Sequence, residues 1–311
     1  MTEHILFHVK KDGFPDSHHL CIVAFCAANS DSMRLNTRDS AVCTTSSHSV
    51  NHRIVCTLAL YLNVFDELPL LLAANRDEHF DRPSAPPAEI FGVPRIVAGR
   101  DLRAGGTWLG VNEHGLMVGI LNRRQNGNDI YTPVTSMARS RGLLCMDILR
   151  LRSVDEGFAF ITAHQAVYNP FTLVFADRHS AGVAHNNHAA IFAKRLGAGV
   201  HVFSSAAELD LNSAKADRAH ARFAQLKERL PAGAVNSQDW LAELRAVLAD
   251  HSMRDGSSDP GDAICVHRQS TGTVSSSVVT LRAERSLFET YFCPGPPCQN
   301  DFSEAIRLSI R

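Results

Sequence analysis

The order of strand-like and helix-like segments from Cys56 onward most constrains what this chain can fold into. Apolar runs at Cys56–Leu62 and Leu70–Ala74 predict a buried hairpin around the turn 63–69. Further strands are predicted at 95–99, 107–111, 116–121, 171–176, 182–185, 200–204, 262–267, 273–281 and 287–292. Helices are predicted at 140–152, with Ser140 as N-cap, and at 155–163, 213–230 and 237–250. Because each hairpin and helix pair must bury one face, this order predicts an α+β fold with two stacked sheets, each covered by helices, in a four-layer αββα sandwich.

Composition narrows the class of protein. The chain has 311 residues, of which 45% are hydrophobic and 20% charged, with a formal net charge of -1. These values are ordinary for a globular protein with a sizeable core. The balanced charge provides no basic surface for a polyanion, so we expect no nucleic-acid partner.

Eight cysteines are spread along the chain without a CxxC motif. This spacing argues against a disulfide framework and is typical of buried thiols in a reducing compartment, so we predict a cytoplasmic protein. Cys293 and Cys298 flank Pro-Gly-Pro-Pro and could hold a metal, but the histidine that a closed tetrahedral site needs is absent nearby in the sequence. Among the sixteen scattered histidines, the close pair His185 and His188 falls in a predicted turn, and we predict no metal site.

The first 55 residues differ in character from the rest. Their longest apolar stretch, Leu20–Ala28, is far shorter than a bilayer-spanning helix requires, and it also makes a poor signal peptide, so no integral membrane segment is predicted. Residues 1–55 show neither helical nor strand periodicity and are predicted to be a disordered or non-native extension. The main domain is predicted at 56–299, followed by a C-terminal tail at 300–311 that forms either a short docking helix or a frayed end.

Several separated motifs follow Cys56 in order, and together they carry a family resemblance. They are Cys56-Thr57, Ala74-Asn75-Arg76-Asp77-Glu78, Asp81-Arg82-Pro83, Ala98-Gly99-Arg100-Asp101, Ala104-Gly105-Gly106-Thr107-Trp108-Leu109-Gly110, Asn122, and the run from Gly272 to Ser277. From Cys56 to about Gln299 the chain resembles the NRDE family, which includes the transport and Golgi organisation type 2 proteins. This resemblance implies the fold of hydrolases with an N-terminal nucleophile, and it implies Cys56 as that nucleophile.

In the NRDE family the cysteine follows the initiator Met directly, whereas 55 residues precede it here. Val55 stands immediately before Cys56, and a valine codon can serve as a bacterial start. We therefore expect translation to begin at Val55 and the initiator to be removed.

The resemblance also implies catalytic roles. A terminal cysteine carries its own base, because an α-amine titrates at about 7.7–8.0 and can take the thiol proton. Arg76 is expected to favour the thiolate and Asp77 to hold the α-ammonium. Asn122 is similar to the asparagine that donates to the oxyanion in penicillin V acylases and bile salt hydrolases.

The other polar motif residues and one aromatic residue are candidates for substrate binding. These candidates are Asn75, Arg100, Asp101, Trp108 and Ser276. Structural alternatives stay open for these candidates. Cys56 and Trp108 could be core residues, and Arg76 and Asp77 could form an ion-pair network with Glu78 and Arg82. The Gly99–Gly106 motifs could set a turn, and the Thr273–Ser277 run could serve close sheet packing.

Two functions are consistent with these observations. The first is a cysteine hydrolase acting on a small molecule with a linear amide C–N bond or an acyl group, without a cofactor. The second, implied by the family's links to haem and acyl-lipid metabolism, is a non-enzymatic carrier of haem or an acyl lipid. The first requires Cys56 to be a free terminal thiol, and the second does not.

Overall fold

The computed structural model describes the part of the chain that carries every predicted motif. The described residues are 56–123, 138–163, 166–186, 190–205, 214–229, 239–253, 256–282 and 284–311. The predicted extension at 1–55 lies outside the described residues, as does His188.

One antiparallel sheet, here called sheet A, has six strands in the order β10-β1-β2-β11-β12-β13. Its strands are β1 (Thr57–Phe65), β2 (Leu68–His79), β10 (Gly199–Ser204), β11 (Thr271–Arg282), β12 (Leu287–Cys293) and β13 (Ile306–Ser309). The predicted first hairpin is confirmed, with Leu58 opposite Ala74 and Leu62 opposite Leu70. This register places Cys56 beside the charged end of β2.

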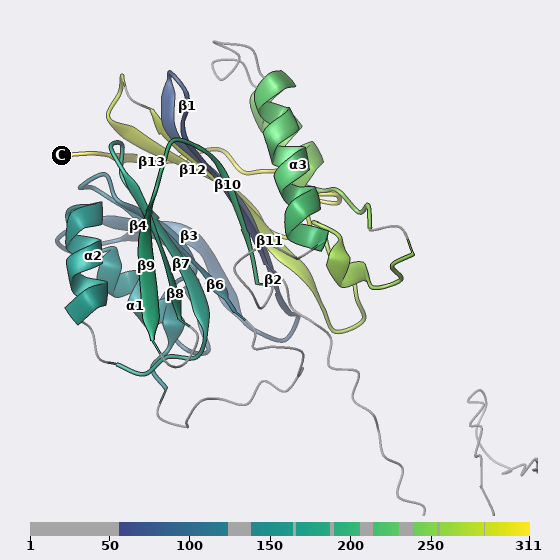
Figure 1. Cartoon of the computed structure of the whole chain (residues 1–311), viewed down its shortest axis with the longest axis horizontal. Coiled ribbons are helices and arrows are strands. Elements are labelled where there is room, and N and C mark those ends of the chain that lie inside the picture. Colours follow the sequence, from purple (N-terminus) through teal and green to yellow (C-terminus); the bar gives the residue numbers. More distant parts are fainter. Residues whose placement is uncertain are drawn as a thin grey trace, which may run out of the picture. The chain divides into compact units, whose positions relative to one another are not determined.

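The second sheet, sheet B, is a seven-stranded antiparallel meander in chain order, β3 to β9. Its strands are β3 (Ser84–Ile90), β4 (Ile96–Asp101), β5 (Leu109–Asn112), β6 (Met117–Asn122), β7 (Phe171–Ala176), β8 (Ala181–Asn186) and β9 (Ile191–Leu196). Helices α1 (Arg141–Ile148) and α2 (Val154–Ala163) connect β6 to β7, whereas α3 (Ala214–Arg229) and α4 (Asp239–Leu248) connect β10 to β11 (Figure 1). Ser140 occupies the N-cap of α1 without a side-chain capping bond.

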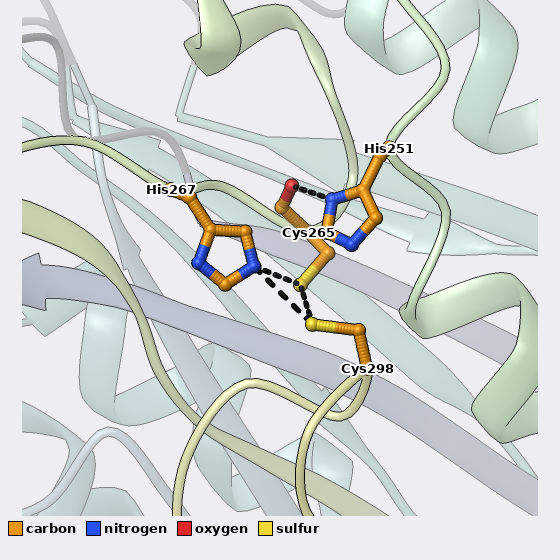
Figure 2. A group of neighbouring side chains, drawn as sticks. All are labelled: His251, Cys265, His267 and Cys298. Atoms are coloured by element: carbon orange, nitrogen blue, oxygen red, sulfur yellow. Dashed lines mark hydrogen bonds between the residues drawn. The ribbon is translucent and has the colours of Figure 1, made fainter.

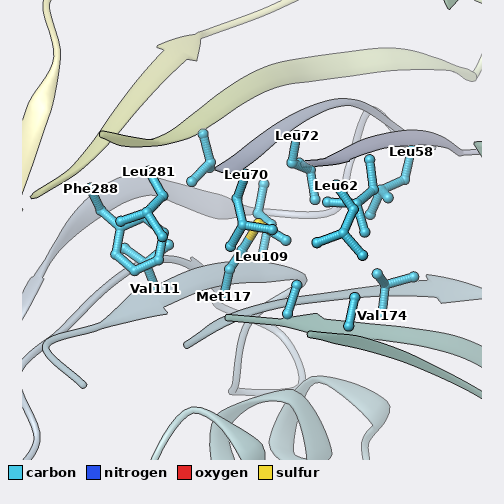
Figure 3. Packing of buried hydrophobic residues seen from close by; sticks show 14 of the residues in the cluster. Leu58, Leu62, Leu70, Leu72, Leu109, Val111, Met117, Val174, Leu281 and Phe288 are labelled. Carbon is cyan, nitrogen blue, oxygen red and sulfur yellow. The ribbon is translucent and has the colours of Figure 1, made fainter. Parts of the chain in front are cut away.

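Three hydrophobic clusters show the four layers. The central cluster contains Leu58, Leu70 and Leu72 of sheet A and Met117 and Val174 of sheet B, so the two sheets pack face to face (Figure 3). The outer face of sheet A packs on α3 and α4, and the outer face of sheet B packs on α1 and α2. The predicted four-layer αββα sandwich is therefore confirmed. Among the helices that the structure describes, none is both long enough and apolar enough to cross a bilayer.

Three strands were absent from the sequence prediction, and each lies at the edge of a sheet. β3 contains Pro86 and Pro87 at a register shift, β9 exposes most of its side chains, and β13 has only four residues. Prolines, exposed side chains and short length all weaken the strand pattern and are tolerated best at edges. β13 replaces the docking helix or frayed end expected for the C-terminus.

The strand predicted at 262–267 is wrong. Pro260–Asp262 forms a 3₁₀ turn, and the buried residues that follow bond to neighbouring segments: the N–H of Cys265 donates to the Asp250 carbonyl (3.0 Å) and that of Val266 to the Thr273 hydroxyl (2.9 Å). The apolar run is a buried connection between α4 and β11. The prediction failed because a short apolar run alone does not distinguish a strand from other buried chain.

Candidate functional site

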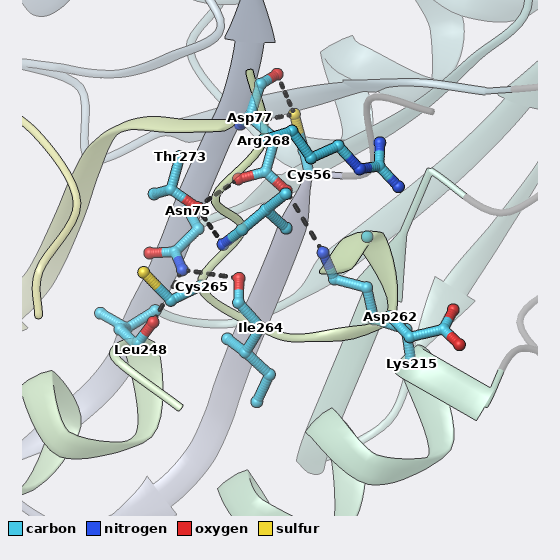
Figure 4. A network of polar contacts seen from close by, with 12 residues as sticks. Cys56, Asn75, Asp77, Lys215, Leu248, Asp262, Ile264, Cys265, Arg268 and Thr273 are labelled. Carbon is cyan, nitrogen blue, oxygen red and sulfur yellow. Dashed lines mark hydrogen bonds and ion pairs between the residues drawn. The ribbon is translucent and has the colours of Figure 1, made fainter. Parts of the chain in front are cut away.

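Cys56 directly precedes β1, and its thiol lies against the backbone of β2. Its Sγ accepts a hydrogen bond from the N–H of Asp77 (3.3 Å) and lies 3.4 Å from the Asp77 carbonyl oxygen, to which the S–H donates (Figure 4). The carbonyl of Cys56 accepts from the N–H of Ser205 (3.2 Å). The end of β1 therefore holds the thiol in one place through main-chain contacts.

Strand alternation separates the two charged residues that were expected to act together. In β2, Leu70 and Leu72 face the gap between the sheets, and Leu71 and Ala73 face α3 and α4. Because successive side chains point to opposite faces, Arg76 shares the face of Leu72, whereas Asp77 shares the face of Ala73. Cys56 packs against the cluster between the sheets. Arg76 thus lies on the thiol's face, and Asp77 contacts the thiol through its backbone alone.

Arg76 is buried, with 8% of its surface exposed, yet it is incompletely paired. Its Nη2 lies 3.7 Å from Oε2 of Glu78, and its guanidinium stands 4.6 Å from the centre of the Trp108 ring. Its Nη1 has no hydrogen-bond partner among the described residues. A buried donor without a partner is rare and calls for an explanation such as a bound ligand. The structural network with Glu78 and Arg82 also exists, since Arg82 Nε lies 3.6 Å from Glu78 Oε2.

The Asp77 carboxylate faces α3 and is held by two partners. Lys215 Nζ lies 3.2 Å from Oδ2, and the Thr273 hydroxyl donates to Oδ1 at 2.6 Å (Figure 4). Burial raises the pKa of Asp77, and these two contacts oppose that shift. Lys215 was missed from the sequence, because a lysine in the first turn of a charged helix is ordinarily solvated.

A β-bulge explains how Thr273 reaches Asp77. β11 pairs Thr273 with Asp77 and Ser275 with Arg76, leaving Val274 as the extra residue. If Val274 were paired regularly, Thr273 would lie opposite Glu78 and share the face of Ser275 and Ser277, which border the space beside Cys56. The bulge turns Thr273 toward the helices.

Asn75 and Ser276 bond to each other on the helix-facing side of sheet A. The Ser276 hydroxyl donates to Asn75 Oδ1 at 2.6 Å, and Asn75 Nδ2 donates to the carbonyls of Leu248 (2.8 Å) and Ile264 (3.0 Å). Asn75 thereby ties the end of α4 and the connection before β11 to the sheet.

Asp101 organises the loop between β4 and β5. Its Oδ1 accepts from the N–H groups of Arg103 and Ala104, both at 3.0 Å, and its Oδ2 lies 2.7 Å from Nη2 of Arg82. Burial would raise the pKa of Asp101, but these hydrogen bonds and the Arg82 charge hold it below its usual range. The predicted glycine turn follows, with φ of +78° at Gly106, where a Cβ would lie 2.2 Å from the backbone of α1.

A cleft of about 280 Å³ opens beside the thiol. It is lined by six of the nine predicted site residues, namely Cys56, Arg76, Asp77, Asp101, Trp108 and Asn122. Asn122, at the end of β6, forms part of the wall near the start of α1. Asn75, Arg100 and Ser276 are not among the lining residues, and the Arg100 side chain is exposed.

A larger hollow of about 850 Å³ lies elsewhere, over α4 and the C-terminal strands. Two of its arginines pair with one glutamate: Arg282 Nε lies 2.8 Å and Arg307 Nε 3.1 Å from oxygens of Glu289. Because its described lining contains no cysteine, we place the candidate site at the smaller cleft.

Burial dominates the electrostatic setting of Cys56. Burial and the nearby Asp77 carboxylate raise the pKa of the Cys56 thiol to about 11, and Arg76 lowers it only in part. In a chain with the 55–56 peptide bond intact, the thiol is therefore protonated at neutral pH. Arg76 acts in the expected direction, but its contribution does not prevail.

The fold and cleft define an α+β protein with two antiparallel sheets, flanking helices and a cysteine at the head of one central strand. The chain belongs to the Transport and Golgi organisation 2 family, whose model matches residues 55–291. Two curated relatives are Transport and Golgi organization protein 2 homologs, one from Homo sapiens (35% identical over 118 residues) and one from Bos taurus (33% over 115). These matches cover 36% and 35% of this chain, and 40% and 38% of the relatives.

Three solved structures of hydrolases are similar to this chain at low identity. Penicillin V acylase from Agrobacterium tumefaciens matches with a TM-score of 0.46 and 15% identity, covering 76% of this chain and 82% of the acylase. A variant of conjugated bile acid hydrolase from Clostridium perfringens matches with a TM-score of 0.49 and 12% identity, covering 80% and 92%. An N-acylethanolamine-hydrolyzing acid amidase ortholog from Caenorhabditis elegans matches with a TM-score of 0.45 and 11% identity, covering 72% and 92%. Identities this low assign neither substrate nor catalytic residues to this chain.

Proposed function

We propose that this protein is a cysteine hydrolase with an N-terminal nucleophile, in which the Cys56 thiol attacks the carbonyl carbon of a small amide or acyl substrate. The observation that carries the proposal is that this thiol and the unpartnered Arg76 Nη1 lie on the same face of sheet A, beside one cleft. A nucleophile and a buried, unoccupied donor on the same face suit a substrate that carries an electrophilic carbonyl and a second oxygen.

Release of the Cys56 nitrogen from its peptide bond would activate the thiol. A free α-amine has a pKa of about 7.7–8.0 and would stand on the same residue as the thiol, whereas a peptide nitrogen cannot accept a proton. The family model begins at Val55, directly before this cysteine. We infer that the active form begins at Cys56, with the negative charge of Asp77 nearby to orient the α-ammonium.

The reaction then follows from these groups. The α-amine takes the thiol proton while the S–C bond forms, and the carbonyl oxygen becomes an oxyanion to which Asn122 donates. The C–N or C–O bond breaks as the leaving group takes the proton from the α-ammonium. Water, deprotonated by the α-amine, hydrolyses the thioester, releases the acid and restores the thiol.

The alternative carrier function has less support from the cleft. The described residues that line it include no histidine or methionine, and Arg76, Glu78, Arg82, Asp101 and Arg139 make it strongly charged. An apolar macrocycle or long acyl chain would leave these charged groups facing apolar surface, which is unfavourable.

The test begins with the intact mass of the protein made from its own gene. We expect a chain that starts at Cys56, and a chain retaining residues 1–54 would contradict the inferred start.

Chains beginning at Cys56 are then incubated with p-nitrophenyl acyl esters and acyl p-nitroanilides of increasing chain length. We expect acylation at Cys56 and turnover, both lost in Cys56→Ala and retained in the control Cys293→Ala. Asn122→Ala should lower kcat by about 10²–10³. Turnover that survives Cys56→Ala would refute the hydrolase proposal.

A further inference from the structure

Four side chains with metal-binding atoms converge in a region that the hydrolase mechanism does not use. They are His251, Cys265, His267 and Cys298, and one ligand atom from each lies within 4.8 Å of all the others (Figure 2). His251 follows α4, Cys265 and His267 precede β11, and Cys298 lies in the turn after β12. Three segments that are separate in sequence therefore meet at this point.

The distances between these atoms match the edges of a zinc tetrahedron. Cys265 Sγ lies 3.7 Å from Cys298 Sγ, and His267 Nε2 lies 3.2 Å from Cys298 Sγ and 3.8 Å from Cys265 Sγ. Zinc bonds of about 2.3 Å to sulfur and about 2.0–2.1 Å to nitrogen give edges of about 3.8 Å between two sulfurs and about 3.5 Å between sulfur and nitrogen. Three of the four corners are thus already in place.

His251 is oriented as a fourth ligand. Its Nδ1 lies 3.1 Å from the carbonyl oxygen of Cys265. Because a carbonyl can only accept, Nδ1 carries the proton, and Nε2 is left with its lone pair. Metal-bound histidines commonly have this second hydrogen bond, which fixes the tautomer and the ring. The ring of His251 lies 5.0 Å from that of His267.

We propose that His251, Cys265, His267 and Cys298 bind one Zn²⁺ in a closed tetrahedral Cys₂His₂ site. Two thiolates and two imidazoles suit zinc and lack the oxygen ligands that Ca²⁺ and Mg²⁺ prefer. Four protein ligands leave no position for water, so the site is structural. The partial exposure of Cys298 and the exposure of both histidines give the ion a route of entry.

A disulfide between Cys265 and Cys298 is the main competing use of these residues. Both thiols are free in the structure, and their 3.7 Å separation exceeds the S–S bond length of about 2.05 Å. A disulfide would also leave both imidazoles without a role, whereas zinc uses all four side chains.

Zinc would stabilise the segment that supports Asp77. Val266, between two of the ligands, donates to the Thr273 hydroxyl at 2.9 Å, and that hydroxyl donates to Asp77 at 2.6 Å. Val266 and these two hydrogen bonds therefore connect the metal site to the Asp77 carboxylate. Because a structural zinc contributes directly to folding free energy, its removal should lower stability.

The test measures zinc in the full chain, purified under reducing conditions and equilibrated with Zn²⁺ before dialysis. We expect about one zinc per chain in the unchanged protein and in Cys293→Ala, and below about a tenth in Cys298→Ser and His267→Ala. Cys293 is the matched control because it is a buried thiol five residues away that donates to the carbonyls of Gly295 and Asn300 (3.5 Å each) instead.

A second measurement needs no variant. Co²⁺ added to the metal-free chain should produce intense ligand-field bands of a tetrahedral site and a thiolate-to-cobalt charge-transfer band. Zinc that is absent from the unchanged protein, or equally abundant in all four chains, would overturn the proposal. Loss of two hydrogens with Cys265 and Cys298 joined in the mass map, and no bound zinc, would assign the pair to a disulfide.

Discussion

The two faces of sheet A at the end of β2 differ in how far their charged groups are paired. On the helix-facing side, Asn75 bonds to Ser276 and Asp77 bonds to Lys215 and Thr273, and the Thr57 hydroxyl opposite Asn75 is buried without a hydrogen-bond partner among the described residues. On the side facing the other sheet, Arg76 Nη1 and the Ser275 hydroxyl are buried without hydrogen-bond partners among the described residues. Buried polar groups that satisfy one another stabilise a fold, whereas unsatisfied ones cost free energy unless a ligand completes them. Under the proposed function, neighbouring residues of one motif serve stability and binding separately.

The largest effect on stability is expected from Lys215→Met. This change leaves the buried Asp77 carboxylate with the Thr273 hydrogen bond and the charge of Arg268 but without its ion-pair partner, so the free energy of unfolding should fall by about 3–5 kcal/mol. Urea denaturation followed by circular dichroism measures it. Lys227→Met, on the exposed side of the same helix, is the control and should change stability by less than about 0.5 kcal/mol. Equal stability of the two variants would mean that the buried ion pair does not support the fold.

Asn75→Ala should have the next largest effect. It removes donors from the carbonyls of Leu248 and Ile264 and should lower unfolding free energy by about 2–3 kcal/mol, whereas Ser276→Ala removes one bond and should cost about 1 kcal/mol. Thermal and urea unfolding of both variants decide this. If Asn75→Ala instead kept full stability and lost substrate affinity, the original expectation that Asn75 binds substrate would be supported.

Arg76→Met should change function more than stability. Its Nη1 has no partner to lose, the ion pair of its Nη2 with Glu78 is long at 3.7 Å, and Glu78 keeps Arg82 as a second partner, so we expect unfolding free energy to change by less than about 1 kcal/mol. A substrate oxygen bound there would gain a charge-assisted hydrogen bond worth about 1.5–3 kcal/mol, so kcat/KM should fall by about 10- to 150-fold. Steady-state kinetics on chains beginning at Cys56 test this. A stability loss as large as that of Lys215→Met would assign Arg76 to the structural network.

The smallest effect at neutral pH concerns the Cys56 thiol itself. Its pKa is raised to about 11, so folding favours the neutral thiol. The resulting contribution to folding stability is complete below the thiol's ordinary pKa and is lost as pH rises toward 11. With the 55–56 peptide bond intact, alkylation of Cys56 by iodoacetamide should rise about tenfold per pH unit between pH 7 and 9 without a plateau. Peptide mass mapping follows it. A chain beginning at Cys56 should react faster at pH 7, and identical profiles for the two chains would argue against activation by the α-amine.

The sequence was sufficient to predict the sandwich, because apolar runs and paired helices constrain which faces are buried. It was also sufficient to bring Cys56, Arg76 and Trp108 to one place. It could not predict that Lys215 is buried, since only the packing of α3 on sheet A removes that side chain from water. Nor could spacing predict that Cys298 lies beside Cys265 and two histidines, because those contacts depend on where three connections cross.

The extra residue in β11 makes that strand run in two phases. From Ser275 to Leu281 the pairing with β2 is continuous, and before Val274 the side chains alternate in the opposite phase. If Val274 formed a regular pair with Asp77, Thr273 would move to the position opposite Glu78 and turn toward the cleft, and the Asp77 carboxylate would lose its hydrogen bond from Thr273. Deleting Val274 would place Thr273 directly before Ser275, still opposite Asp77 and still on the helix side, so the pairing would continue without a bulge. The unpaired position of Val274 therefore decides which layer of the molecule Thr273 joins.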